Sequence, residues 1–285
     1  MARPFAEVIG DPIAQSKSPM LHGFWIERLG LDADYRRKHV RAADLPTYFA
    51  DRRTDPAWLG CNVTIPHKQA VMPLLDRIDP QAAAIGAVNT IAREGDQLVG
   101  YNSDALGFLE PLRPLLDDRH LLRTARILGT GGAARAVAHA LWHERFSLII
   151  AGRDIAKAEA LADLFDRNDA HAAPLAHFAE RIHFDWGDLD QRLDVLVNTT
   201  SLGMTGQPPL EIDFSTVPPG AVVYDAVYAP LDTPLLMDAR ARGHRTIDGL
   251  RMLVGQARIA FRHFFGADPP SDGSGDAELR ALLLS

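Results

Sequence analysis

The sequence contains little cysteine and no long apolar run. Cys61 is the one cysteine among 285 residues, which excludes an intrachain disulfide and any metal site built from several cysteines. A membrane-spanning helix needs about 20 apolar residues in succession, and no stretch approaches that length. The segment from Met1 to Gly10 also lacks the apolar run of a signal peptide. We therefore expect a soluble protein, and the single cysteine is typical of the reducing cytoplasm.

The net charge argues against nucleic-acid binding, and the placement of the histidines argues against a metal site. The 37 acidic and 30 basic residues give a net charge of −7, and no long cluster of lysine and arginine could follow a phosphate backbone. Nucleic acid and membranes are therefore not expected partners. His139 and His143 have the spacing of metal ligands on a helix, but no glutamate follows His139 and no third ligand is suggested. We expect no metal site and interpret the two histidines as part of a helix face.

The order of apolar segments predicts an α/β protein of two domains. No repeat of fixed period is present, and short apolar runs alternate with longer amphipathic ones, as in βα units. We place the crossover between domains just after Asp104. In the first part we expect strands near Ala6–Gly10, Tyr35–Val40, Trp58–Thr64, Ala87–Ala92 and Gln97–Tyr101, and helices near Pro19–Leu29, Leu45–Arg52 and Lys68–Leu75.

The second part repeats the alternation and ends in helices. A helical segment, Ala105–Leu116, leads into it. We expect strands at Arg126–Leu128, Ser147–Ala151, Val195–Asn198 and Ala221–Asp225, and helices at Ala133–Trp142, Ile155–Phe165, Met252–Phe265 and Ala277–Leu284. Residues 268–276 have the composition of a loop.

A glycine turn predicts a dinucleotide site. Gly129, Gly131, Gly132, Ala133 and Ala134 belong to a G-x-G-x-x-A pattern that directly follows a predicted strand and opens a predicted helix. The glycines permit a tight turn and a close approach of the backbone to a pyrophosphate. The alternative is a tight turn without a nucleotide, and the βαβ setting favours the nucleotide.

The end of the next strand bears on which dinucleotide binds. Arg153 and Lys157 form a cationic corner suited to a 2′-phosphate, whereas an acidic residue there would accept from a 2′-hydroxyl. Asp154 lies between them and is also well placed to cap the following helix. The charge balance favours NADP, with NAD left open. Lys157 could equally belong to a solvated helix face.

Polar side chains of the first part surround a lysine. Ser16 and Ser18 could bind a carboxylate, although an S-x-S-P pattern taken alone favours helix capping. Lys68 lies in a predicted helix that Pro66 would open after a strand. Asp104 likewise follows an apolar run, and an amine near a carboxylate can exchange a proton as a carbonyl becomes an alcohol. Asn89 could join this group or be a turn residue.

Several motifs in a fixed order carry a resemblance to one family. The chain resembles the shikimate dehydrogenases, with quinate/shikimate dehydrogenases as near relatives, over nearly its whole length. The motifs are Gly10–Ile13 with Ser16–His22, Asn62–Lys68, Gly86–Thr90, Gly100–Asp104, the glycine turn, Asn198–Met204, Tyr224–Tyr228, Asp248–Leu250 and Met252–Ala257.

The resemblance implies a fold, a reaction and a site. Residues 1–104, completed by residues 249–285, would form a mixed-sheet substrate domain, and residues 105–248 a Rossmann-type domain that binds NAD(P). The reaction would be reduction of 3-dehydroshikimate in the shikimate pathway of aromatic amino acid biosynthesis. Lys68 and Asp104 would be the catalytic pair. The substrate carboxylate would bind to Ser16, Ser18 and Tyr228. The ring hydroxyls of the substrate would bind to Thr64, Asn89, Asp104 and Gln256. The cofactor would bind to the glycine turn, Arg153, Asp154, Lys157, Thr200, Ala226 and Gly249.

Departures from the family pattern keep alternatives open. Gly23, Arg251 and Gly255 replace residues more usual in the family, and none of these removes a catalytic group. Asp154 stands where NADP-specific members usually carry threonine. One alternative is therefore an NAD-preferring quinate dehydrogenase, and another is a regulatory module that binds NAD(P) without turnover. A monomer and a homodimer both remain open.

Overall fold

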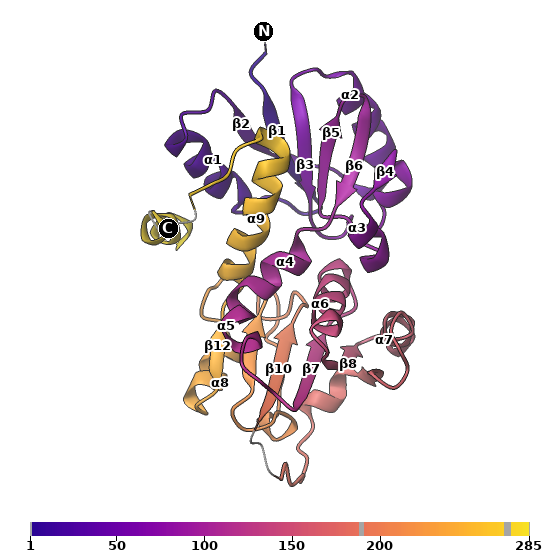
Figure 1. Cartoon of the computed structure of the whole chain (residues 1–285), viewed down its shortest axis with the longest axis vertical. Coiled ribbons are helices and arrows are strands. Elements are labelled where there is room, and N and C mark those ends of the chain that lie inside the picture. The colour runs from indigo at the N-terminus through magenta and orange to yellow at the C-terminus, as the bar shows by residue number, and fades with distance from the viewer. Residues whose placement is uncertain (1, 188–190, 271–274, 285) are drawn as a thin grey trace. The chain divides into compact units, whose positions relative to one another are not determined.

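The chain forms two compact units in the computed structural model, which describes residues 2–187, 191–270 and 275–284. The first unit consists of Met1–Asp104 and Leu253–Ser285, and the second of Ala105–Met252. Each contains a six-stranded sheet with helices packed against it (Figure 1). The predicted α/β class is confirmed.

The sheet of the first unit is mixed. Its strands lie in the order β2-β1-β3-β5-β6-β4 (Figure 1). Strand β1 pairs in parallel with β2 and β3, β5 runs antiparallel to both of its neighbours, and β4 is parallel to β6. All of β1 is buried, as expected for a central strand covered on both faces. The strands are β1 (Phe5–Gly10), β2 (Asp34–His39), β3 (Trp58–Val63), β4 (Arg77–Ile78), β5 (Thr90–Glu94) and β6 (Gln97–Tyr101).

Helices from both ends of the chain complete the first unit. The helix α10 packs beside α1, far from it in sequence (Figure 1). The helices of this unit are α1 (Ser18–Arg28), α2 (Leu45–Thr54), α3 (Pro80–Ile85), α10 (Asp276–Leu284) and the part of α9 (Gly249–Phe265) from Leu253 onward.

The sheet of the second unit is parallel throughout, in the order β12-β11-β10-β7-β8-β9. The chain moves outward from β7 through β8 to β9 and then returns to β10 on the other side. This is the doubly wound order of dinucleotide-binding folds, with a topological switch point between β7 and β10. The strands are β7 (Leu122–Leu128), β8 (Ser147–Gly152), β9 (Ala170–Pro174), β10 (Arg192–Asn198), β11 (Val222–Asp225) and β12 (Arg245–Ile247).

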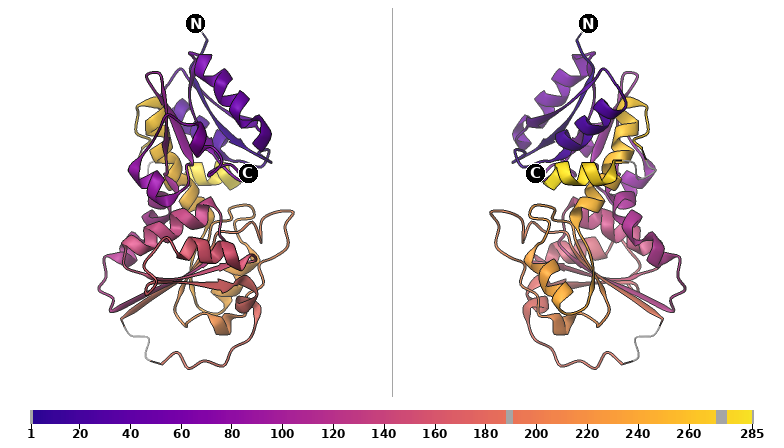
Figure 2. Two further views of the ribbon diagram at one scale, coloured as in Figure 1. Left: turned by 90° about the vertical axis from the view of Figure 1, so that its right-hand side faces the viewer. Right: turned by 90° about the vertical axis from the view of Figure 1, so that its left-hand side faces the viewer.

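Helices connect consecutive parallel strands, α6 after β7, α7 after β8 and α8 after β11, whereas β10 is joined to β11 by a loop with a 3-10 turn at Phe214–Thr216. Figure 2 shows them around the second sheet from two sides. Helices α6 and α7 pack against β7, β8 and β9, whereas α8 packs against β11 and β12. The connecting helices are α6 (Gly132–His143), α7 (Ile155–Ala162) and α8 (Pro234–Ala241), and the short helices α4 (Asp104–Leu109) and α5 (Arg113–Leu116) precede β7.

The segment after β3 is not the helix that the sequence predicted. We expected a helix at Lys68–Leu75 opened by Pro66, but the segment forms turns and one short 3-10 helix. The carbonyl of Lys68 accepts the N–H of Val88 at 2.8 Å, and the N–H of Met72 bonds three residues back instead of four. An α-helix needs the bond from Met72 to Lys68. Pairing with the segment before β5 therefore replaces the helix.

Other predicted elements are present with changed limits. The helix expected at Ala105–Leu116 is divided into α4 and α5 by a 3-10 turn, where Pro111 and Pro114 lack the N–H that a continuous helix uses. The strand expected at Ala87–Ala92 begins only at Thr90. Among the strands and α-helices, β4, α3, β9, α8 and β12 were not predicted.

Candidate active site

The structure brings Lys68 and Asp104 together in the first unit. Lys68 lies in the turn that follows β3, and Asp104 follows β6 at the start of α4. The Lys68 Nζ to Asp104 Oδ2 distance is 2.5 Å, and the side chains are only 12% and 6% exposed. Charges so little exposed are stable only when they are paired. The geometry therefore gives a largely buried ammonium–carboxylate pair.

Asn89 holds the other oxygen of the Asp104 carboxylate. Its Nδ2 donates to Asp104 Oδ1 at 2.9 Å and to Ser103 Oγ at 2.9 Å. Its Oδ1 accepts from the backbone N–H of Ser103 at 2.8 Å. Both carboxylate oxygens of Asp104 thus have a partner, which fixes the plane of the carboxylate. Asn89 therefore lies beside the Lys68–Asp104 pair and is hydrogen-bonded to it, which goes beyond the role of a turn residue.

Gln256 joins this group from the C-terminal helix α9. Its Oε1 lies 3.4 Å from Asn89 Nδ2 and 3.3 Å from Ser103 Oγ, and its Nε2 donates to the carbonyl of Leu253 at 3.0 Å. The side chain is buried. A segment distant in sequence therefore supplies an amide to the Lys68–Asp104 site.

Sequence reasoning missed the polar residues that support Asn89. Asn62 on β3 is the cross-strand partner of Thr90 on β5, and its Nδ2 donates to Thr90 Oγ1 at 3.1 Å. Thr90 Oγ1 donates in turn to Asn89 Oδ1 at 3.1 Å, and Tyr35 donates its hydroxyl hydrogen to Asn62 Oδ1 at 2.6 Å. Asn62 and Thr90 lie within the motifs quoted above. Their position in those motifs was the one signal that could have identified them.

The serines of the first loop do not cap α1. Lys17 is the N-cap residue, and no side chain caps the helix, so the capping interpretation is wrong. Ser16 Oγ instead accepts the backbone N–H of Ser18 at 3.3 Å, and Arg37 Nε donates to the carbonyl of Ser16 at 2.8 Å. Both serines are buried. Thr64 follows β3, and its N–H donates to the carbonyl of Ile9 at 3.0 Å.

The glycine turn of the second unit has the shape that a pyrophosphate site requires. Gly129 has φ +121°, and a Cβ there would lie 2.4 Å from Thr199 Oγ1. Gly131 has an ordinary φ of −81°, and a Cβ there would meet nothing within 4 Å. Gly132 begins α6, with Ala133 next. Packing within the protein explains why residue 129 is a glycine, but it does not explain the glycine at residue 131. The missing side chain of Gly131 leaves open the space in which a ligand would approach.

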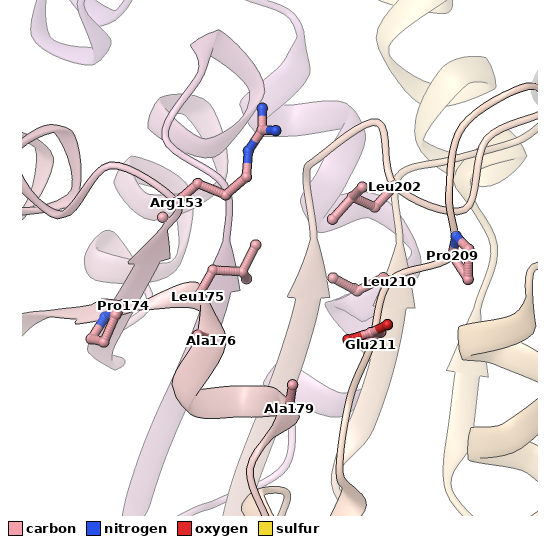
Figure 3. Close-up of a pocket in the computed structure, with 10 residues that line it drawn as sticks. Arg153, Pro174, Leu175, Ala176, Ala179, Leu202, Pro209, Leu210 and Glu211 are labelled. Atoms are coloured by element: carbon pink, nitrogen blue, oxygen red, sulfur yellow. The ribbon is translucent and has the colours of Figure 1, made fainter.

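Arg153 of the cationic corner borders a pocket of about 360 Å³, whereas the exposed Lys157 is not among the residues that line it. Figure 3 shows Arg153 and Leu175 on one side of this pocket and Leu202, Leu210 and Glu211 on the other. The pocket lies after the carboxyl end of β8, on the side of the sheet edge where open α/β sheets bind ligands.

Asp154 is the N-cap of α7, as its position predicted. Its side chain accepts from the N–H of Lys157 at 3.4 Å, and the Lys157 Nζ lies 3.5 Å from its carboxylate. The carboxylate of Asp154 thus already caps α7 and pairs with the ammonium of Lys157. This local role reduces its repulsion of a phosphate near Arg153.

Three loops meet at the ends of β10, β11 and β12 in the second unit. Thr200 Oγ1 donates to Asn198 Oδ1 at 2.7 Å. A Cβ on Gly249 would lie 2.4 Å from the carbonyl oxygen of Ala226, so the backbones of these residues are in close contact. Tyr228 follows β11 in the same unit. The roles predicted for these residues stay predictions.

The part of the chain that the structure describes supplies no third ligand to His139 and His143. The ring centroids of His139 and His143 are 4.4 Å apart, and burial, followed by the charge of His143, lowers the pKa of His139. Within residues 2–187, 191–270 and 275–284, no group of three or more His, Cys, Asp or Glu side chains could hold a metal ion. Among the described helices, none combines the length and apolar character needed to cross a bilayer.

Known protein families match three parts of the chain. Residues 8–91 match the model of the shikimate dehydrogenase substrate binding domain, residues 117–199 that of shikimate / quinate 5-dehydrogenase, and residues 249–273 that of the shikimate 5'-dehydrogenase C-terminal domain. A shikimate dehydrogenase (NADP(+)) of Sphingopyxis alaskensis is 50% identical over 288 aligned positions, which cover 100% of this chain and 98% of that protein. The chain belongs to the shikimate dehydrogenase family.

Solved structures of shikimate dehydrogenase relatives share both units. The shikimate 5-dehydrogenase of Thermus thermophilus, in complex with NADP(H) and shikimate, has 34% identity and a TM-score of 0.81, covering 98% of this chain and 99% of that one. The quinate dehydrogenase of Corynebacterium glutamicum, in complex with NAD, has 32% identity and a TM-score of 0.82, covering 99% of both chains. The predicted family and fold are thus confirmed.

Proposed function

We propose that the chain catalyses the reversible NADPH-dependent reduction of 3-dehydroshikimate to shikimate. The observation that carries this proposal is the 2.5 Å ion pair of Lys68 and Asp104 in a member of the shikimate dehydrogenase family. Asn89 and Gln256 lie next to the pair and offer amide groups to a polyhydroxylated ring. A carbonyl-to-alcohol reduction needs a proton donor at the oxygen, and the lysine ammonium provides one.

In the proposed reaction, bound NADPH would supply a hydride to the C3 carbonyl carbon. The Lys68 ammonium donates a proton to the oxygen as it becomes an alkoxide, which gives the alcohol. Asp104 orients the ammonium and stabilises its positive charge before the transfer. In the oxidation direction the same groups remove the hydroxyl proton. Holding the reactants side by side contributes further, since correct orientation is worth roughly 7–11 kcal/mol of barrier.

Two sets of residues would bind the reactants. Ser16, Ser18 and Tyr228 would hold the substrate carboxylate, whereas Thr64, Asn89, Asp104 and Gln256 would receive its ring hydroxyls. The turn at Gly129, Gly131, Gly132 and Ala133 would hold the pyrophosphate of the cofactor, with Arg153 and Lys157 at the 2′-phosphate. Thr200 would bind the cofactor, and the backbone around Ala226 and Gly249 would meet the nicotinamide. Residues 1–104 with 249–285 would thereby supply the substrate contacts other than Tyr228, and residues 105–248 the cofactor contacts other than Gly249.

The preference for NADP rests on Arg153. Its guanidinium borders the pocket after β8, and arginine pairs well with phosphate. Asp154 is engaged as a helix cap and as the partner of Lys157, which favours NADP over NAD. We further propose a cytoplasmic protein, in keeping with its single cysteine, that works as a monomer or a homodimer.

A quinate dehydrogenase that prefers NAD is the second candidate. The sequence argument for it is Asp154, which caps α7 in the structure. A second argument is the similarity to the quinate dehydrogenase of Corynebacterium glutamicum with NAD. The presence of Arg153 argues against it. A regulatory module without turnover has less support, because the Lys68–Asp104 pair is complete.

A matrix of initial rates, with shikimate and quinate against NADP⁺ and NAD⁺, separates these functions. We expect the highest kcat/KM with shikimate and NADP⁺, and we expect Lys68→Ala to reduce kcat at least about 100-fold, as for loss of a general acid. Lys38→Met, on the exposed part of β2, serves as a control for loss of a lysine. Near-normal turnover by Lys68→Ala would refute the role of the lysine. A preference for quinate and NAD⁺ would support the second candidate.

A further inference from the structure

The loop that carries Ser16 and Ser18 is connected to the C-terminal helix of the chain. Lys17 lies between the two serines, and its Nζ donates to the carbonyl of Leu283 at 2.5 Å. Leu283 belongs to the last turn of α10, more than 260 residues away in the sequence. The lysine side chain is thereby held against a helix end.

This bond has a clear physical basis at the helix end. The last four carbonyls of an α-helix lack partners within the helix, and the C-terminus carries a partial negative charge. A lysine ammonium satisfies one such carbonyl and complements the charge. Helix α10 is itself anchored, since Leu279 and Leu283 are each only 2% exposed and Arg28 donates to Glu278 at 3.2 Å. The helix therefore provides a firm attachment for Lys17.

Other hydrogen bonds of this loop lie within its turn or reach β2, whereas that of the Lys17 side chain reaches α10. Arg37 fixes the carbonyl of Ser16, and the hydroxyl of Ser16 accepts the N–H of Ser18. The carbonyl of Lys17 accepts the N–H groups of Met20 and Leu21 at 3.1 Å each. These bonds define the local turn and join it to β2. The side chain of Lys17 joins the same turn to the end of the chain.

We propose that Lys17 is a positioning residue that uses α10 to hold Ser16 and Ser18 in the geometry that binds a carboxylate. This proposal rests on the proposed function, because it assumes that the two serines receive the carboxylate of the substrate. Lys17 acts through α10 and does not touch the substrate. Its loss loosens the loop and affects substrate binding more than proton transfer.

Steady-state kinetics of Lys17→Met test this role. We expect the KM for shikimate to rise about tenfold, as for a lost hydrogen bond to a charged group. The kcat and the KM for NADP⁺ should change by less than about twofold, because Lys68 and the second unit are untouched. Lys17→Arg keeps a cationic donor and should restore part of the affinity. Lys38→Met is the matched control. An unchanged KM for shikimate in Lys17→Met would overturn the proposal.

A double-mutant cycle distinguishes positioning from direct contact with the substrate. Leu279→Ala weakens the packing of α10 without changing a charge. If Lys17 acts through α10, Leu279→Ala raises the KM for shikimate, and the double variant with Lys17→Met is no worse than Lys17→Met alone. Additive effects, or no effect of Leu279→Ala, would mean that Lys17 acts on the substrate directly and would overturn the proposal.

A measurement on the wild-type chain avoids any failure of a variant to fold. Because coupling is reciprocal, shikimate that orders the Ser16–Ser18 loop should slow amide hydrogen exchange in α10. Unchanged exchange in α10 at saturating shikimate would contradict the proposal. A wild-type chain that neither binds nor oxidises shikimate would refute the proposed function and this inference with it. Normal wild-type kinetics with an unaltered Lys17→Met variant would refute this inference alone.

Discussion

Asp225 is a fully buried carboxyl at the end of β11. Its Oδ1 accepts from Asn198 Nδ2 at 2.9 Å and from the N–H of Val227 at 3.0 Å, and its Oδ2 accepts from Thr233 Oγ1 at 2.6 Å. These partners lie at the end of β10, after β11 and at the N-cap of α8. Burial raises the pKa of Asp225 to about 6, although the hydrogen bonds act to lower it.

The raised pKa of Asp225 predicts a pH dependence of stability. The folded chain holds the proton more tightly than the unfolded chain, so the stabilisation is complete below about pH 4 and is lost as the pH rises through about 6. The loss amounts to about 3 kcal/mol, from roughly two pKa units at 1.36 kcal/mol each. Asp225→Asn should therefore lose less stability than the wild type between pH 4 and pH 7, as measured by thermal unfolding. Asp232→Asn, an exposed carboxylate, is the control. Parallel curves for Asp225→Asn and wild type would contradict the shifted pKa.

Single residues were predictable where their role is local. The capping role of Asp154 follows from its place before a helix, and the structure confirms it. The same reasoning was wrong for Ser16 and Ser18, because the helix starts one residue later than capping by Ser16 requires and no side chain caps it. The contact of Asn62 with Thr90 depends on the register of two antiparallel strands, which the local sequence does not specify.

Elements were predictable where hydrophobic periodicity was long, and less so where strands and helices are short. Strand β6 has the predicted limits, and the βαβ unit at the glycine turn is present. Helices α3 and α8 were missed although Asp79–Pro80 and Thr233–Pro234 are ordinary start signals. The helix expected after β3 was wrong because Lys68 bonds to a segment 20 residues later. Such a tertiary contact overrides local preference.

The turn between β7 and α6 contains two glycines, and substituting each should affect stability and cofactor binding differently. Gly131→Ala adds a methyl group to open space at an ordinary φ, so stability should change by less than about 1 kcal/mol. The methyl group would occupy the approach to the pyrophosphate, so we expect the KM for NADPH to rise at least about tenfold. Thermal unfolding and the KM together test this prediction.

Gly129→Ala is the matched comparison for Gly131→Ala. Its positive φ and the 2.4 Å approach to Thr199 should cost at least about 1–3 kcal/mol of stability before any cofactor is added. A Gly131→Ala variant with normal affinity for NADPH would contradict the assignment of the turn. Equal stability losses in both variants would contradict the structural difference between the two positions.

At the scale of the whole molecule, the alternation of strands and helices was sufficient to predict two α/β units. The parallel order of the second sheet follows from the connection rules for βαβ units. The return of α9 and α10 to the first unit does not follow from periodicity, because it depends on contacts such as that of Gln256 with Asn89. The family resemblance, and not periodicity, was the source of the expectation that residues 249–285 complete the first unit, which in the structure begins again at Leu253.

The assignment of substrate and cofactor to separate units predicts two distinct patterns of protection from hydrogen exchange. NADP⁺ at about 100 times its Kd adds about 2.7 kcal/mol to the stability of the state that binds it. We expect NADP⁺ to slow exchange chiefly at residues 129–134 and 150–157, and shikimate to slow it chiefly at residues 16–18, 62–68, 89–90 and 102–104. Mass spectrometry of peptic fragments, with each ligand alone, measures both patterns. Quinate at the same concentration is a control for the substrate class, and protection by shikimate confined to residues 105–248 would overturn the assignment.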